Sequence, residues 1–332
     1  MRTILVNPIS FVVAILAVVI LLIPSLVVLP YRAGPVNKID SIPVNTTEKV
    51  NSPKPIKGKV VEVAVYRAAL AKTEKLPIDD YLVGVVAAEM PADFELEALK
   101  AQALTARTFI MKRMKGPQDT GLPGGAIVSD TVDHQVYKNK NELKKIWGSE
   151  YEWKLNKITA AVRATSGQII TYNDEPITAS FFSTSNGYTE NSEDYWANKF
   201  PYLRSVKNPW DEDSPKFLHQ KLVLIKDFEK ILGVSIKGKS IGVIKARTEG
   251  HRVKEVSIGS KVFTGREIRE KLDLKSSDFT WVKKDEYIVI TTKGYGHGVG
   301  MSQYGANGMA KKGKTYEEII DFYYKDVKIK RM

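Results

Sequence analysis

Residues 76–115 have the sequence LPIDDYLVGVVAAEMPADFELEALKAQALTARTFIMKRMK, which predicts two helices separated by a proline. The first helix begins at Ile78, because acidic residues follow in its first turn and apolar residues then recur at helical spacing. Pro91 cannot continue this helix and disfavours the helical conformation at Met90. We expect the second helix to begin after Asp93, which would act as its N-cap.

Glu89 lies in the last turn of the first predicted helix, in the run AAEMP. The negative end of the helix dipole and the small or apolar neighbours both disfavour an ionised carboxylate, so we expect its pKa to be raised. A general acid needs such a pKa near neutral pH. From this segment alone, Glu89 is either a catalytic acid and base or a solvated carboxylate at the end of a helix.

The second predicted helix carries two polar residues, Gln102 and Arg107, among alanines that allow close packing against a neighbour. Arg107 is either an ordinary surface arginine or a hydrogen-bond donor that faces a substrate groove beside Glu89.

The composition favours an acidic partner. The chain has 332 residues, with 50 basic and 38 acidic side chains and a net charge of +12. This charge suits nucleic acid, a membrane surface or an anionic cell wall. The sequence has no zinc-finger, helix-turn-helix or basic-zipper pattern, which argues against nucleic acid. It has no cysteine, which excludes disulfides and thiolate metal sites.

The N-terminal segment predicts a membrane anchor. No charged residue occurs between Thr3 and Tyr31, and the apolar run is long enough to cross a bilayer as a helix. No clear A-x-A cleavage site follows, although a cleaved signal peptide is the alternative. We therefore expect a short cytoplasmic tail (1–8), a transmembrane signal anchor (9–30), a flexible linker (31–58) and an extracytoplasmic domain (59–332).

The domain after the linker predicts an α+β fold, because antiparallel strands and hairpins alternate with unevenly spaced helices. Strands are expected at 59–66, 168–172, 177–183 and 287–292, and further helices at 155–165, 302–311 and 316–324. Residues 217–281 are expected to form an inserted α/β subdomain, with helices at 222–232 and 265–272 and strands at 241–248 and 253–258. No chemistry is evident in this insert.

Two further runs are candidates for ligand contacts. The run STSNGYTE (183–190) and the aromatic residues after it suit sugar binding, although they equally suit a polar loop beside core aromatics. The run GYGHGVG (294–300) allows close backbone approach but lacks the spacing of a nucleotide fingerprint. His297 within it is either a second proton carrier or a structural histidine. His134 has no convincing second ligand nearby, so we predict no metal site.

Four motifs follow one another along the chain: YLVGVVAAEMP with KAQALTARTF, DxxHQVY, SFFSTSNGYTENSEDYW and GYGHGVGMSQYGA. In this order they resemble the stage II sporulation protein D family of endospore-forming bacilli. The resemblance extends from about Lys59 to the C-terminus. It implies a membrane-anchored lytic transglycosylase without a cofactor, acting on peptidoglycan during engulfment of the forespore. The catalytic glutamate of the family falls on Glu89. Some relatives hold zinc through cysteines near the position of His134, and this chain has none.

The resemblance also implies partners and a location. The substrate would be glycan strands from which an amidase, stage II sporulation protein P, has removed the peptides. Stage II sporulation protein M would be the membrane scaffold, and nucleic acid would not be a partner. The domain would lie between the mother-cell and forespore membranes. The family includes modifiers of autolysins, so a non-catalytic glycan-binding activator of a cell-wall amidase is the alternative.

The expected mechanism needs one carboxyl group. Glycosidases normally use two, but here the C6 hydroxyl of N-acetylmuramic acid is an intramolecular nucleophile. We expect Glu89 to protonate the leaving oxygen of N-acetylglucosamine and then to accept the C6 hydroxyl proton, which leaves a 1,6-anhydromuramyl end. Candidate substrate contacts are Gln102, Arg107, Ser183, Ser185, Asn186, Tyr202, Arg204, His297 and Gln303.

Overall fold

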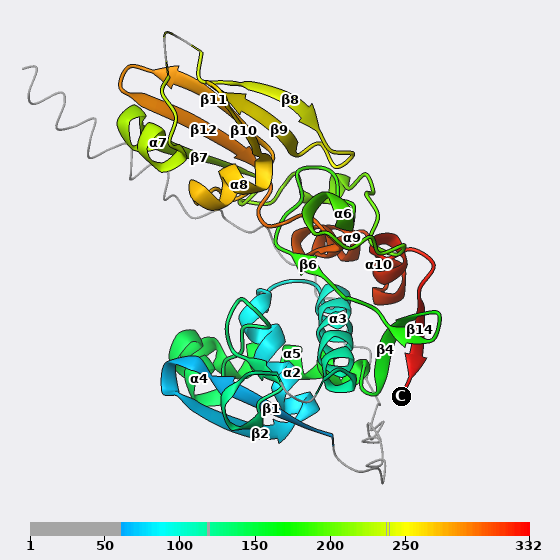
Figure 1. Ribbon diagram of the computed structural model, residues 1–332. Helices are drawn as coiled ribbons and strands as arrows, with labels where there is room; N and C mark the ends of the chain where they lie inside the picture. Colours follow the sequence, from blue (N-terminus) through cyan, green and yellow to red (C-terminus); the bar gives the residue numbers. More distant parts are fainter. Residues whose placement is uncertain (1–60, 118–119, 237, 239) are drawn as a thin grey trace, which may run out of the picture. The chain divides into compact units, whose positions relative to one another are not determined.

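The computed structural model describes residues 61–117, 120–236, 238 and 240–332 (Figure 1), all within one compact unit, Gly58–Met332. The predicted tail, membrane span and linker lie outside the described residues and stay predictions. Within the described part of the chain, no helix is both long and apolar enough to cross a membrane. The mixture of helices and antiparallel strands confirms the predicted α+β fold.

Two helices, α2 (Ile78–Glu89) and α3 (Leu96–Lys115), form the centre of the first hydrophobic core, as predicted. They pack against each other and against α5 (Tyr151–Ala164). The predicted N-cap of α3 was wrong. Asp93 lies in the turn that Phe94 closes by donating its N–H to the carbonyl of Pro91, and Glu95 is the residue at the N-cap position. The N–H of Glu95 donates to the side-chain oxygen of Asn307, 2.8 Å away, which ties this helix start to the C-terminal part of the chain.

Small sheets surround this helical core. The first has the order β2-β1-β3, with β1 (Glu62–Arg67) antiparallel to β2 (Lys72–Pro77) and parallel to β3 (Val128–Ser129). In the second, β4 (Gln168–Tyr172) pairs with β5 (Glu175–Pro176) and with β14 (Lys328–Arg331). The predicted return strand at 177–183 is mostly irregular. Only β6 (Phe181–Phe182) is extended, and it pairs in parallel with β13 (Met301–Ser302).

The remaining helices of this part are α4 (Lys140–Trp147), α6 (Ser192–Tyr195), α9 (Gln303–Lys311) and α10 (Tyr316–Tyr323). Short 3-10 helices lie at Ala68–Leu70, Pro123–Gly125, Gly148–Glu150 and Pro209–Asp211. The helices predicted at 155–165, 302–311 and 316–324 correspond to α5, α9 and α10.

The insert has its own hydrophobic core, which includes Phe228, Ile258, Ile268 and Ile288. It contains two three-stranded antiparallel sheets, in the orders β10-β9-β8 and β11-β12-β7, and two helices (Figure 1). Its elements are β7 (Leu218–Leu224), α7 (Ile225–Leu232), β8 (Val243–Arg247), β9 (Val253–Ile258), β10 (Lys261–Thr264), α8 (Gly265–Lys271), β11 (Phe279–Lys284) and β12 (Tyr287–Lys293). Because β12 pairs with β7, the insert extends beyond the predicted end at residue 281.

Candidate active site

Glu89 is the last residue of α2, which ends there because Met90, before Pro91, has an extended backbone. One carboxylate oxygen, Oε1, accepts a hydrogen bond from the backbone N–H of Val136 at 3.0 Å. The side-chain amide of Gln303 donates to the backbone carbonyl of Glu89 at 3.1 Å. Burial raises the pKa of Glu89 and outweighs the hydrogen bond from Val136, which acts in the opposite direction. The half-buried carboxyl group of Glu89 therefore holds its proton more tightly than the carboxyl group of an exposed glutamate does.

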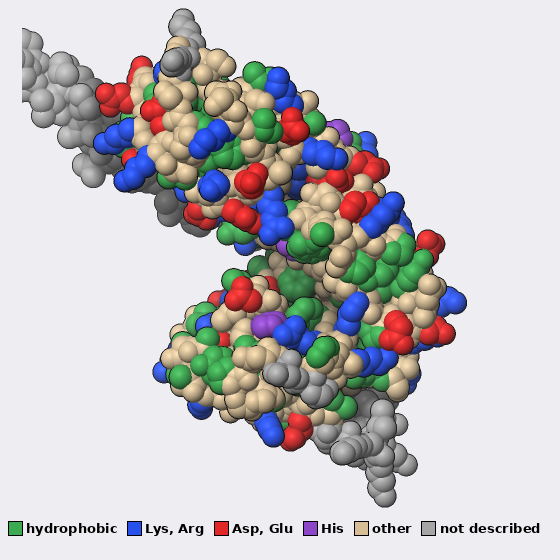
Figure 2. All heavy atoms as spheres, in the orientation of Figure 1, with side chains coloured by type: hydrophobic (Ala, Val, Ile, Leu, Met, Phe, Trp, Pro, Cys, Tyr) green, Lys and Arg blue, Asp and Glu red, His purple; other side chains and the backbone are tan. Residues whose placement is uncertain are grey.

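The Glu89 side chain lines a cavity of about 780 Å³, within the size range of ligand pockets. Figure 2 shows a hollow in this face of the protein, with hydrophobic side chains on its floor. The apolar and aromatic residues of the wall include Phe109, Phe181, Phe182, Trp196, Phe200 and Tyr295. Aromatic rings of this kind stack on the apolar faces of sugar rings. The polar members are Glu89, Asp133, His134, Thr178, Ser180, Ser183, Asn198, Arg269, His297 and Gln303.

The two histidines of the cavity are neutral near pH 7. The Nδ1 atom of His134 accepts the backbone N–H of Ser129 at 3.2 Å, and burial lowers the pKa of His134. The Nδ1 atom of His297 accepts the backbone N–H of Val299 at 3.0 Å, and burial lowers the pKa of His297 to about 3. Neither ring is an imidazolium that could donate a proton. Asp133, the other carboxyl group of the lining, is exposed to solvent, so Glu89 is the candidate acid.

The structure brings four predicted site residues together in this cavity: Glu89, Ser183, His297 and Gln303. The His297 ring packs among Phe182, Tyr195 and Trp196, with centroid separations of 5.1–5.7 Å. These contacts favour the structural interpretation of His297 over a proton carrier.

The predicted Arg107 contact is not at the cavity. Arg107 is fully buried and donates to the carbonyls of Thr165 and Val162 and to the carboxylate of Asp79. It therefore joins α3 to α5 and α2. Arg107 is neither a surface arginine nor a donor that faces a substrate groove, which were the two interpretations from the sequence.

The other predicted contacts on this side of the domain also lie outside the cavity lining. Gln102 is fully buried, with its side-chain oxygen 3.5 Å from the side-chain nitrogen of Gln303. The hydroxyl of Tyr202 accepts the backbone N–H of Thr178 at 2.9 Å, and Arg204 forms an ion pair with Glu193. Each of these side chains thus bonds to another residue of the protein.

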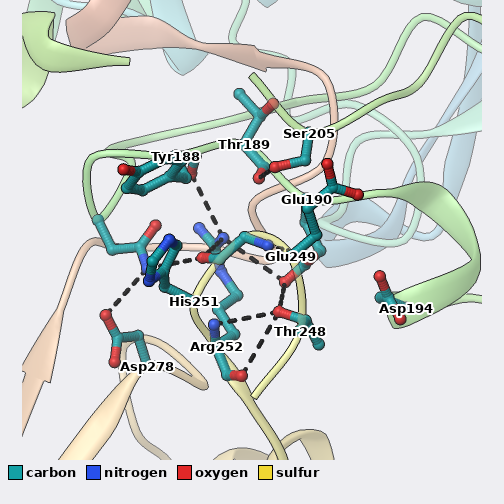
Figure 3. Close-up of polar contacts among 12 residues, drawn as sticks. Tyr188, Thr189, Glu190, Asp194, Ser205, Thr248, Glu249, His251, Arg252 and Asp278 are labelled. Atoms are coloured by element: carbon teal, nitrogen blue, oxygen red, sulfur yellow. Dashed lines mark hydrogen bonds and ion pairs between the residues drawn. The ribbon is translucent and has the colours of Figure 1, made fainter. Parts of the chain in front are cut away.

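The run STSNGYTE connects the insert to the rest of the domain (Figure 3). The hydroxyl of Ser185 donates to the buried carboxylate of Asp211 at 2.7 Å. The side-chain amide of Asn186 donates to the carbonyl of Gly250 at 3.0 Å and to Asp278 at 2.9 Å, both in the insert. Ser185 and Asn186 are therefore buried structural residues, whereas we expected them to contact substrate.

A buried ion pair continues this connection. Glu190 lies 3.7 Å from Arg252 of the insert, and both side chains are almost fully buried (Figure 3). Thr248 donates its hydroxyl to Glu190 at 2.7 Å, and the N–H of Glu190 donates to the carbonyl of Gly298 at 2.8 Å. A Cβ atom at Gly298 would lie 2.2 Å from the guanidinium carbon of Arg252, so this glycine permits the close contact. The ion pair thus holds the loop that carries His297 against the insert.

Sequence reasoning missed Arg269, the cavity residue that comes from α8 of the insert. No local motif marks it, because its role depends on where the insert packs. Tyr295 was within a recognised motif but was not selected. In the described part of the chain, no group of three or more His, Cys, Asp or Glu side chains is arranged to hold a metal ion.

Comparison with known proteins agrees with the resemblance seen in the sequence. A family model described as "Stage II sporulation protein" matches residues 66–172. The chain is 49% identical to stage II sporulation protein D of Bacillus subtilis, over 95% of this chain and 94% of that protein. It is 48% identical to the protein of the same name from Bacillus amyloliquefaciens, over 97% and 96% of the two chains. It is also 32% identical to the amidase enhancer of Bacillus subtilis, over 73% of this chain and 39% of that protein. With nearly half of its residues shared along almost its whole length, the chain belongs to the stage II sporulation protein D family.

Proposed function

We propose that this protein is a lytic transglycosylase that cleaves peptide-free peptidoglycan strands between N-acetylmuramic acid and N-acetylglucosamine. The observation that carries the proposal is the half-buried Glu89 carboxyl, with its raised pKa, in an aromatic cavity whose two histidines are neutral. Such a cavity suits a glycan, and such a carboxyl suits proton transfer to a glycosidic oxygen.

In the proposed reaction, the Glu89 proton passes to the oxygen that leaves with N-acetylglucosamine. The bond between C1 of N-acetylmuramic acid and that oxygen breaks, and the C6 hydroxyl of the same sugar attacks C1. The Glu89 carboxylate then accepts the hydroxyl proton and returns to its starting state. No water is consumed, and the product ends in a 1,6-anhydro sugar. The intramolecular attack replaces the second carboxyl group and the water of an ordinary glycosidase.

We propose that the reaction takes place outside the cytoplasm. Residues 9–30 would anchor the protein in the cell membrane, with residues 59–332 between the mother-cell and forespore membranes, where the septal wall is remodelled during engulfment. The proposed partners are an amidase that removes the peptides (stage II sporulation protein P) and a membrane scaffold (stage II sporulation protein M).

A second candidate function is a glycan-binding activator of a cell-wall amidase. It is favoured by the relative that is named amidase enhancer. Both functions use the same cavity, so they differ in whether bonds in the glycan are broken.

The deciding experiment incubates the full chain with peptide-free glycan strands and identifies the new ends by mass spectrometry. The transglycosylase predicts ends that are lighter by one water molecule than the reducing ends of hydrolysis. Reducing ends would indicate a hydrolase with a second carboxyl group. Binding to glycan without new ends, together with faster amidase action, would support the activator.

A further inference from the structure

Arg269 reaches the Glu89 cavity from the insert. It lies on α8 and is one of the residues that line the cavity. Its Nη1 atom donates to the hydroxyl of Tyr195 at 2.8 Å, and its Nε atom donates to the carbonyl of Leu274 at 3.3 Å. These two contacts hold the guanidinium in place from different segments of the chain.

The guanidinium of Arg269 has no carboxylate partner within ion-pair distance among the residues that the structure describes. Its remaining terminal nitrogen, Nη2, donates to no protein oxygen in the same set of residues. Arg266, one turn earlier on α8, pairs instead with Glu270 at 2.7 Å. Arg269 is therefore a half-buried cation that is held in place, and its Nη2 atom is available to donate a hydrogen bond to a ligand.

Two lysines add positive charge next to Tyr295, another residue of the cavity lining. The ammonium groups of Lys216 and Lys275 lie 5.4 and 5.5 Å from the ring centroid of Tyr295, which also lines the cavity. Neither lysine forms an ion pair with a described acidic residue. An anionic group on a ligand would therefore be attracted to this wall, and a planar guanidinium suits a carboxylate best.

If the ligand is the proposed peptide-free glycan, one of its two sugars carries an anionic group that could bind to this wall. N-acetylglucosamine is neutral, whereas N-acetylmuramic acid carries a lactyl ether that ends in a carboxylate. A stem peptide converts this carboxylate into an amide, and removal of the peptide restores it. A cation on the cavity wall therefore distinguishes peptide-free strands from peptide-bearing ones.

We propose that Arg269 binds the lactyl carboxylate of a muramic acid residue and is the residue by which the cavity selects peptide-free glycan. This inference rests on the proposed glycan substrate. It assigns the insert a direct part in substrate recognition.

The test compares the full-length wild-type chain with Arg269→Gln on two glycans. One is the peptide-free strand, and the other is the same strand with its lactyl carboxylates converted to neutral amides. We expect Arg269→Gln to raise KM, or to weaken glycan binding, by about 10–100-fold on the carboxylate strand, as for the loss of a hydrogen bond between charged groups. On the amidated strand the wild type and the variant should agree within about twofold. Arg269→Lys should recover part of the loss, because the charge returns without the planar fork.

The matched control is Lys271→Gln, which removes one positive charge from an exposed position at the end of α8. It should leave both glycans unaffected. An equal loss on both glycans for Arg269→Gln, or no loss on either, would overturn the inference. If the wild type makes no anhydro ends, the transglycosylase proposal fails, but the binding comparison between the two glycans still decides the role of Arg269.

Discussion

Replacement of Glu89 by glutamine should greatly slow the reaction and leave the fold intact. The amide has the shape of the carboxyl group, and its oxygen can still accept the N–H of Val136. The raised pKa means that the folded protein binds the Glu89 proton more tightly than the unfolded chain does. The wild type therefore loses stability as the pH rises through the pKa of Glu89, whereas the amide has no charge to bury. At neutral pH, Glu89→Gln should unfold at the same temperature as the wild type or at a higher one.

The size of the catalytic loss follows from what else lines the cavity. His134 and His297 are neutral, because burial lowers the pKa of each. Asp133 is the other carboxyl group among the lining residues, and it is exposed to solvent. With no neighbour suited to replace the acid, the variant should lose the whole contribution of general acid–base catalysis, about 10²–10⁴-fold in rate. This loss corresponds to about 2.7–5.4 kcal/mol of barrier height.

The assay is the rate at which anhydro ends appear from peptide-free glycan, with thermal unfolding and glycan binding measured on the same preparations. Asp133→Asn is the matched control, and it should retain more than about a tenth of the wild-type rate. Glu89→Gln with more than about a tenth of the wild-type rate would refute the role of Glu89. A comparable loss in Asp133→Asn would show that the reaction needs two carboxyl groups.

Three further outcomes are expected. The rate of the wild type should fall as the pH rises through the raised pKa of Glu89, because the protonated carboxyl starts the reaction. A pH–rate profile that stays flat into alkaline solution would contradict this role of Glu89. Burial raises the pKa of Asp211 to about 6 from its ordinary 3.8, so the wild type should lose about 2 kcal/mol of unfolding free energy relative to Asp211→Asn as the pH rises from about 4 to about 7. Urea denaturation across this pH range measures the unfolding free energy of both proteins. If the two free energies change in parallel with pH, the raised pKa of Asp211 is contradicted. Glu190→Ala leaves Arg252 buried without its partner, so it should lower the unfolding free energy by about 3–5 kcal/mol. A loss under about 1 kcal/mol in urea denaturation would mean that the ion pair does not hold the insert.

Local features of the sequence were sufficient for the framework of the site. Pro91 ends α2, so the position of Glu89 at a helix end follows from residues next to it in the chain. The α+β class and most helices after residue 150 follow from apolar periodicity in the same way. The start of α3 was misplaced, because Asp93 is a common N-cap residue while the structure uses Asn307, a distant residue, to bind the helix start.

Which polar side chains face the cavity was decided by tertiary structure alone. Arg107 bonds to Thr165, 58 positions away, and Asn186 bonds to Asp278, 92 positions away. Arg269 lines the cavity because the insert carries it there from a segment without a motif. Caps, prolines and periodicity act within a turn or two of the chain, so a sequence indicates local conformation well. Whether a polar group meets substrate, water or a buried partner depends on residues that only folding brings near it, and the sequence by itself contains no local sign of that choice.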